Sequence, residues 1–83
     1  MSQIDESKIK QEIKEIVSKI VSVDVSKIAD DTHFVEDLHA DSMMVLEIMV
    51  ALEKKFKVEI SEQELPKLVS ISQITTLVLS LLG

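Results

Sequence analysis

The sequence contains no cysteine and few of the residues that form turns or aromatic cores. Tryptophan and tyrosine are also absent, and there is one glycine and one proline in 83 residues. Without cysteine the chain can form no disulfide and no thiolate metal site, and it has no nucleophilic thiol of its own. A composition that is 46% hydrophobic, yet so poor in glycine and proline, favours a compact helical protein over a sheet or a disordered chain.

Positive charge is missing from the middle of the chain. The formal net charge is −6, from nine lysines and fifteen acidic residues. No cation occurs between Lys27 and Lys54, whereas that segment holds seven acids: Asp30, Asp31, Glu36, Asp37, Asp41, Glu47 and Glu53. The excess negative charge therefore originates in this central segment. It disfavours nucleic acid and anionic membranes as partners and favours basic protein surfaces.

Long apolar runs are absent as well. No stretch approaches the roughly 18 apolar residues of a membrane span, and the first residues lack the basic flank and apolar core of a signal peptide. We therefore expect no membrane insertion and a cytoplasmic location. The length suits one domain, residues 1–83, with a small core, and we expect a monomer.

Apolar residues recur at helical spacing in the first quarter of the chain, at Ile9, Ile13, Ile16, Val17 and Ile20. This pattern predicts a first helix over about residues 3–21, opened by a capping-box-like pair of Ser2 and Asp5. From residue 22 to 41 the period fails. A segment of this length in so small a domain is expected to be an ordered loop packed on the helices, with Phe34 as its anchor.

Three further helices are expected after this loop. A long one covers residues 42–56, with Asp41 as the N-cap that accepts backbone N–H groups of the first turn. Ser61 opens a short helix that Pro66 should shorten or distort, and Ser70 begins the last helix. The predicted fold class is all-α: a small bundle of four helices, three longer ones and a short third helix.

The helix predicted over residues 42–56 has two apolar faces. At about 100° per residue, one arc is a core face, formed by Val45, Ile48, Met49, Leu52 and Phe56. A second apolar set lies on another side of the helix, formed by Met43, Leu46 and Val50. Because one helix with two apolar faces needs two things to pack against, the second face predicts contact with something other than the core.

Ser42 stands where this helix begins, and three roles are possible for a serine at this position. A serine nucleophile working with His39 and Asp41 is disfavoured, because the chain lacks the G-x-S-x-G pattern around it. A calcium loop starting at Asp37 is also disfavoured, because its sixth and twelfth positions would be Ser42 and Ile48 instead of glycine and an acid. No metal site is therefore expected.

The third role is modification of Ser42 by another protein. An exposed hydroxyl at a helix N-terminus lies where free backbone N–H groups and the helix dipole favour a phosphate group. The plain alternative is that Ser42 only helps to begin the helix.

The residues around Ser42 resemble those of a known family. The run is Phe34-Val35-Glu36-Asp37-Leu38-His39-Ala40-Asp41-Ser42-Met43, followed by Glu47, Ala51-Leu52-Glu53 and Phe56. It is similar to the acyl carrier proteins of type II fatty acid synthesis, whose signature is Asp-Ser-Leu. The similarity extends over essentially the whole chain.

The resemblance implies a right-turning four-helix bundle whose serine, here Ser42, carries 4′-phosphopantetheine transferred from coenzyme A by a phosphopantetheinyl transferase. Asp41 and Met43 would flank this cofactor. The arm's thiol would hold acyl groups as thioesters for enzymes of fatty acid or specialised acyl or polyketide pathways, so the protein would be a carrier and not an enzyme. The alternatives are an aminoacyl or peptidyl carrier and a helical interaction module without a prosthetic group.

The resemblance also implies two contact regions. The partner enzymes, with basic docking surfaces, would meet Asp41, Met43, Leu46, Glu47, Val50 and Glu53. The acyl chain would be sheltered between helices by Leu46, Val50, Ile60, Leu65 and Leu68.

Three features depart from the family pattern: His39, the loss of acids at Met44 and Lys54-Lys55, and Pro66 beside the bulky Leu65, which is expected to reshape the acyl cavity. His39 replaces a glycine, and histidine is among the residues that tolerate a positive φ. Met44 and the pair Lys54-Lys55 stand where acids are common, which weakens the negative surface of the helix. We therefore expect a dedicated partner in place of the usual housekeeping enzymes.

Overall fold

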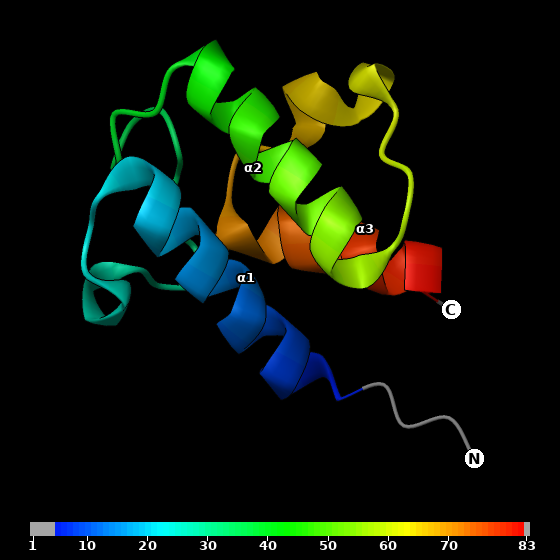
Figure 1. Cartoon of the computed structure of the whole chain (residues 1–83). Helices are drawn as coiled ribbons and strands as arrows, with labels where there is room; N and C mark the ends of the chain where they lie inside the picture. Colours follow the sequence, from blue (N-terminus) through cyan, green and yellow to red (C-terminus); the bar gives the residue numbers. More distant parts are fainter. Residues whose placement is uncertain (1–4, 83) are drawn as a thin grey trace.

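The computed structural model describes residues 5–82, apart from the side chains of Leu65 and Lys67. Within residues 5–82, three α-helices and two 3₁₀-helices follow one another (Figure 1). Their bounds are α1 Glu6–Val21, η1 Val25–Lys27, α2 Ser42–Phe56, η2 Glu62–Lys67 and α3 Ile71–Leu82. Between residues 5 and 82 the only extended pairing is an isolated bridge of His33 with Ser70. The expectation of an all-helical fold is confirmed.

The helix α1 begins later than the sequence pattern predicted. Its N-cap is Asp5, whose backbone is extended and whose carboxylate accepts the N–H of Lys8 at 3.2 Å. A start at residue 3 is therefore wrong, because a residue with extended geometry cannot lie inside the helix. The proposed role of Ser2 lies outside the described residues.

The helices α2 and α3 begin where the sequence predicted from their capping residues. Asp41 is the N-cap of α2. At the start of α3 the side chains of Ser70 and Gln73 exchange hydrogen bonds with each other's backbone N–H groups, at 3.4 and 3.2 Å. This reciprocal arrangement satisfies N–H groups that have no partner inside the helix.

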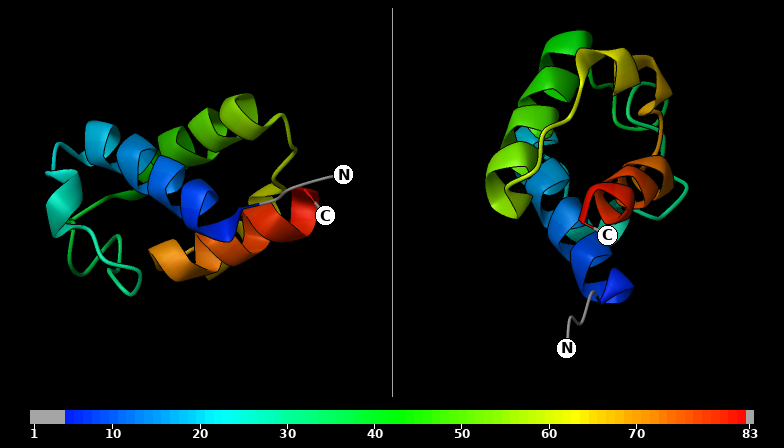
Figure 2. Two further views of the ribbon diagram at one scale, coloured as in Figure 1. Left: turned by 90° about the horizontal axis from the view of Figure 1, so that it is seen from below. Right: turned by 90° about the vertical axis from the view of Figure 1, so that its right-hand side faces the viewer.

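The segment expected to form a short third helix is the six-residue 3₁₀-helix η2, with Pro66 inside it. Proline lacks an N–H and disfavours helical geometry in the residue before it, which accounts for the tighter and shorter form. In both ribbon figures η2 runs back from the end of α2 toward the start of α3 (Figure 2). Thus α2, η2 and α3 surround one side of the core.

One aliphatic core joins the helices. Phe34, Ile13, Ile48 and Leu52 are completely buried in it, as is Ile71 at the start of α3. The predicted core face of α2 is confirmed for Val45, Ile48, Met49 and Leu52, and Phe56 packs against the same cluster while partly exposed. Burial of aliphatic side chains thus fixes which face of α2 points inward.

The segment between α1 and α2 is held at several points. Phe34 is buried in the core, as expected of an anchor, and its N–H donates to the carbonyl of Val69 at 2.9 Å. The N–H of Ser72 donates to the carbonyl of Asp30 at 2.8 Å. The Asp30 carboxylate also pairs with Lys10 and Lys14 of α1, at 3.0 and 2.8 Å. These contacts tie the segment to the start of α3 and to α1.

None of the helices among residues 5–82 is long and apolar enough to cross a membrane.

Candidate functional site

Ser42 is the first residue of α2, and its side chain is exposed. The preceding Asp41 has an extended backbone, and its Oδ1 accepts the N–H of Met44 at 2.9 Å. The carbonyl of Asp41 accepts the N–H of Val45 at 3.1 Å. The first N–H groups of a helix have no partner within it, so this end of α2 offers donors and a positive dipole end beside the hydroxyl.

His39 shapes the turn that leads into this site. Its backbone φ is 58°, in the left-handed region, and the side chain is exposed. The expectation that His39 adopts a positive φ is confirmed. Ala40, next in the chain, is buried and donates its N–H to the carbonyl of Phe34 at 2.8 Å. The turn therefore fixes where Asp41 and Ser42 stand relative to the core.

A hollow of about 280 Å³ opens beside Ser42. Its walls come from the segment before α2, from α2 itself and from the end of η2, and they consist of Val35, Ser42, Val45, Pro66, Leu68 and Val69. Every wall residue other than Ser42 is apolar. Val35 and Val69 are also well exposed, at 65% and 41%. The hydroxyl of Ser42 thus stands at the edge of an open apolar hollow.

A second hollow, of about 440 Å³, lies on the outer side of α2. Its lining consists of Ile20 of α1 and six residues of α2: Met43, Leu46, Glu47, Val50, Ala51 and Lys54. Met43 is 65% exposed and Val50 is 47% exposed, whereas Leu46 is half-buried. We call the α2 residues that line it the outer face of α2. It brings together four of the residues predicted to meet partner enzymes.

Most of the central acids are engaged within the molecule. Besides Asp30 and Asp41, the side chains of Glu36 and Asp37 contact His33, through its ring and its N–H respectively, and Glu53 is bonded to the chain after α2. Among residues 5–82, Asp31 and Glu47 are the two central acids whose side chains make no hydrogen bond or ion pair. The sequence placed the charge correctly but could not show how much of it is partnered.

Asp30 is the central acid that forms ion pairs with two lysines, Lys10 and Lys14. Its hydrogen bonds with Lys14 and Lys10 hold the pKa of its carboxyl below the usual value. The same contact, as the main cause, raises the pKa of Lys10. Because the side chains of Lys10 and Asp30 both remain in contact with water, solvent screens the attraction between them.

Glu53 differs from the other residues predicted for docking. It is half-buried, and its carboxylate accepts the N–H of Ile60 at 2.8 Å. That bond ties the end of α2 to the segment leading into η2. Glu53 and Asp41 do not line the hollow on the outer face of α2. Their contact with partner enzymes stays a prediction.

The residues predicted to shelter an acyl chain do not line one common cavity among the described side chains. Leu46 and Val50 line the outer hollow, and Ile60 is buried in the core. Leu68 is also buried, and it borders the hollow beside Ser42. Nothing is described of the side chain of Leu65. Leu68 is therefore the one of these residues placed next to Ser42.

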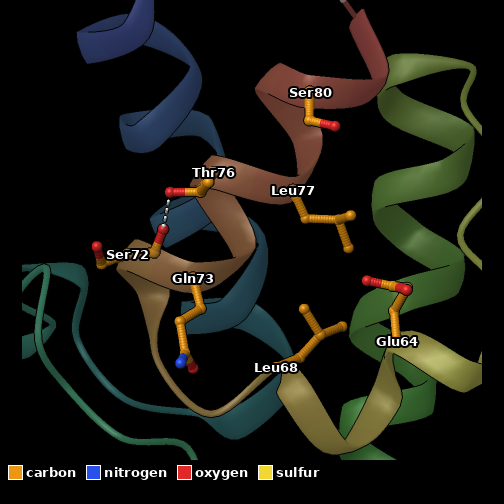
Figure 3. A pocket seen from close by; sticks show the side chains of 7 residues that line it. All are labelled: Glu64, Leu68, Ser72, Gln73, Thr76, Leu77 and Ser80. Atoms are coloured by element: carbon orange, nitrogen blue, oxygen red, sulfur yellow. Dashed lines mark hydrogen bonds between the residues drawn. The ribbon is translucent and has the colours of Figure 1, made fainter.

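Leu68 also borders a third hollow, of about 350 Å³, between η2 and α3. Figure 3 shows Leu68, Leu77 and Glu64 pointing toward one another there. The α3 side is lined by the polar residues Ser72, Gln73, Thr76 and Ser80, and the hydroxyl of Thr76 donates to the carbonyl of Ser72 at 3.0 Å (Figure 3). This polar groove is separate from the one at Ser42 and shares only Leu68 with it.

Sequence reasoning missed several of the residues that surround the site. Val35, Pro66 and Val69 line the hollow beside Ser42, and Ile20 lines the outer one. Val35 and Val69 belong to segments outside the long helices, where no periodic pattern reveals which side chains meet. Within residues 5–82 no group of three or more acids or histidines is arranged to hold a metal ion.

Known proteins match the chain across this same region. The family model described as "Phosphopantetheine attachment site" matches residues 11–78. The "Polyketide-8 synthase acyl carrier protein 2" of Streptomyces avermitilis is 40% identical over 74 residues, which cover 89% of this chain and 85% of that protein. An "Acyl carrier protein" of Campylobacter fetus is 43% identical over 63 residues, covering 76% and 82%. One from Thermosynechococcus vestitus is 38% identical over 71 residues, covering 86% and 88%.

The matched span runs from within α1 to within α3 and includes Ser42 with both hollows of α2. The chain therefore belongs to the acyl carrier proteins of the phosphopantetheine attachment family, which are carriers with a covalently attached 4′-phosphopantetheine and not catalysts.

Proposed function

We propose that Ser42 is the residue that bears 4′-phosphopantetheine, and that the chain presents acyl groups on this arm to partner enzymes. The observation that carries the proposal is the position of Ser42, exposed in the first turn of α2 beside an apolar hollow and inside the span that matches the family. When bound, the arm supplies a thiol on which an acyl group is held as a thioester.

The residues at the site suit such an arm. The N–H groups of Ser42 and Met43 are the first two of α2 and favour a phosphate on the neighbouring hydroxyl. Asp41 caps Met44, but its negative charge opposes a phosphate, so the transferase has to screen it during the transfer. The reaction joins the Ser42 oxygen to the phosphorus that bears the pantetheine arm of coenzyme A, and the nucleotide part of coenzyme A leaves.

The hollow beside Ser42 is the proposed shelter for the first part of the arm and its acyl chain. Val45, Leu68 and Val69 give it apolar walls, and apolar walls favour burial of an alkyl chain at roughly 0.8 kcal/mol per methylene. We propose that the chain enters past Leu68 and that the buried Ile60 also shelters it. Leu65 stays a predicted member of this shelter. The fold then acts as a bundle of four helical elements, with η2 as the short third element.

The outer face of α2 is the proposed docking surface. Met43, Leu46 and Val50 present apolar side chains there, and Glu47 presents a free carboxylate. The positions of Leu46 and Val50 favour this role over that of an acyl shelter. The hydrogen bond of Glu53 to Ile60 favours a structural role for that residue. A phosphopantetheinyl transferase and acyl-processing enzymes are the proposed partners.

The names of the similar proteins are compatible with two kinds of pathway for the acyl group. One of these proteins is named for a polyketide synthase, and others are named only as acyl carrier proteins. We propose that the chain serves acyl groups of the fatty acid or polyketide type. An aminoacyl group on the same arm would give the same attachment chemistry and is distinguished by the group found on the thiol.

The test of the proposed function is the intact mass of the chain after incubation with coenzyme A and a phosphopantetheinyl transferase. The wild-type chain should gain one phosphopantetheine and the Ser42→Ala variant none. Ser72→Ala is a matched control, because Ser72 is also an exposed serine in the first turn of a helix. This control should be modified like the wild type.

A wild-type chain that stays unmodified, while a known carrier in the same reaction is fully converted, would contradict the proposal. Such a result would favour a helical interaction module without a prosthetic group. Modification of Ser42→Ala would show that another residue is the attachment point.

A further inference from the structure

We infer that the outer face of α2 is built for a partner helix of mixed charge, with a basic side chain facing Glu47 and an acidic side chain facing Lys54. This inference rests on the proposed function, because it names the kind of partner that docks on the proposed surface. It differs from a uniformly basic partner, which the net charge of the chain alone would favour.

Of the three consecutive charged residues near the end of α2, two have side-chain partners within the molecule and one does not. Glu53 holds the N–H of Ile60. Lys55 pairs with Glu12 of α1 at 3.5 Å. Lys54, between them, is exposed, and its side chain makes no hydrogen bond or ion pair within the described part of the chain. Of these three charged residues, only Lys54 is left to meet a partner.

Glu47 is the acid that remains free at the other end of the same face. Like Lys54 it is exposed, and both residues line the outer hollow. Seven residues separate them, which is two helical turns, so they stand about 10 Å apart along the axis on the same side of α2. Of the two charges in the hollow, the negative one is therefore nearer Ser42 and the positive one nearer the C-terminus of α2.

Apolar residues line the hollow between these two charges and on the Ser42 side of Glu47. Met43, Leu46, Val50 and Ala51 line the hollow together with Ile20. An amphipathic helix that binds in an apolar groove commonly contacts it through side chains that lie one or two helical turns apart. A partner helix with a basic and an acidic residue two turns apart, and leucine-like residues between them, matches both the charges and the apolar floor.

A uniformly basic partner fits this face less well. It would place a cation opposite Lys54, and like charges facing each other across an interface are unfavourable. The unpaired Lys54 therefore lowers the affinity for uniformly basic partners, which would bind well to an entirely acidic face. This is the physical basis for a dedicated partner. The sequence suggested such a partner from Met44, Lys54 and Lys55 together, and the charges of the outer face favour Lys54 as the residue responsible.

Two synthetic stapled helical peptides can test the inference. Both carry the same leucines on one face. The mixed peptide has an arginine and a glutamate two turns apart, and the basic peptide has arginine at both positions. Binding to the full chain, after loading with phosphopantetheine, is followed by changes in the NMR signals of its backbone amides.

The wild-type chain should bind the mixed peptide about 3- to 10-fold more tightly than the basic one, since exposed charge pairs contribute little each. The signals that change should be those of Met43, Leu46, Val50 and their neighbours on α2. Lys54→Glu should reverse the preference. Lys8→Glu is the matched control: Lys8 is exposed on α1, and this variant alters the net charge equally but should keep the wild-type preference.

Three results would overturn the inference. The first is an equal or reversed preference of the wild-type chain. The second is a preference that Lys54→Glu leaves unchanged. The third is a dimer of the free chain in sedimentation that Lys54→Glu dissociates, because a second copy would then cover the face. Failure of the proposed function itself would appear separately, as an unmodified Ser42 in the intact mass of the same sample.

Discussion

The inner and outer faces of α2 carry similar aliphatic residues in very different surroundings. Ile48 and Leu52, on the inner face, are completely buried in the core, whereas Met43 and Val50, on the outer face, are 65% and 47% exposed. Hydrophobic side chains stabilise a fold only where they are removed from water. The inner face therefore holds the fold together, and the outer face is left for contact with another protein.

The charges of α2 divide in the same way. Glu53 and Lys55 are bound within the molecule, while Glu47 and Lys54 are free on the outer face. Ser42 lies at the start of the helix, between the outer hollow and the smaller hollow at its other side. If Ser42 bears the arm as proposed, the arm starts at the edge of the smaller hollow and one residue from the outer one.

The largest expected difference between the two faces concerns the free energy of unfolding. Replacing Ile48 with alanine should lower it by about 2–5 kcal/mol, because a buried cavity is left behind. Val50→Ala should change it by less than about 1 kcal/mol, because half of that side chain already meets water. Urea unfolding of both variants measures the two values.

If Ile48→Ala does not fold, Ile48→Val is the milder probe, with an expected loss of about 0.5–1.5 kcal/mol. Equal losses at residues 48 and 50 would contradict the division of α2 into a structural and a free face.

The next difference concerns the two acids of α2. Glu53→Ala should lower the free energy of unfolding by about 1–3 kcal/mol, because it leaves the N–H of Ile60 without its acceptor in a partly buried place. Glu47→Ala should change it by no more than about 0.5 kcal/mol. Hydrogen exchange of the Ile60 amide should become faster in Glu53→Ala alone, and unchanged protection would argue against this bond in solution.

A smaller effect is expected for the loop acid Asp30, which is paired with Lys10 and Lys14. Its pKa is lowered in the folded chain, so its contribution to stability is complete above the ordinary carboxyl pKa and is lost as the pH falls through the lowered value. Asp30→Asn should therefore lower the Tm at neutral pH, and the difference from the wild type should vanish in strong acid.

The neighbouring Asp31 provides the control for this measurement. It is exposed and has no hydrogen bond or ion pair in the described part of the chain. Asp31→Asn should leave the Tm at neutral pH nearly unchanged. If the two variants behaved alike at neutral pH, the ion pairs of Asp30 would not contribute to stability.

The smallest expected effect is that of salt on the Tm. The run of acids without cations predicts repulsion that salt relieves, so the Tm should rise with ionic strength. Because most of these acids have partners in the fold, the rise should be modest. Glu47→Gln should reduce it further, since it removes a free acid. A Tm independent of salt in the wild-type chain would contradict a cluster of unbalanced charge.

The parts of the fold set by neighbours in sequence were predictable. Asp41 as a cap, the helix from residue 42 to 56 and its inner apolar face all depend on contacts within one or two turns. The positive φ of His39 followed from the residue that it replaces. The start of α1 was misplaced because two polar residues could each cap it, and local pattern does not decide between Ser2 and Asp5.

The parts set by distant contacts were not predictable. Asp30 pairs with Lys10 and Lys14, which lie far back along the chain in α1. Glu53 accepts the N–H of Ile60 across the end of α2. Val35 and Val69 line one hollow although they come from segments on either side of α2. Such contacts arise only when the helices have packed, so a sequence pattern shows the charge or the apolar residue but not its partner.

The most direct measurement of the central claim is the position of the prosthetic group on the wild-type chain. After reaction with coenzyme A and a phosphopantetheinyl transferase, the chain is cleaved and the modified peptide is sequenced by mass spectrometry. The account predicts that phosphopantetheine is found on Ser42 and on no other serine. A group on a serine elsewhere, or no group at all under conditions that convert a known carrier, would contradict it.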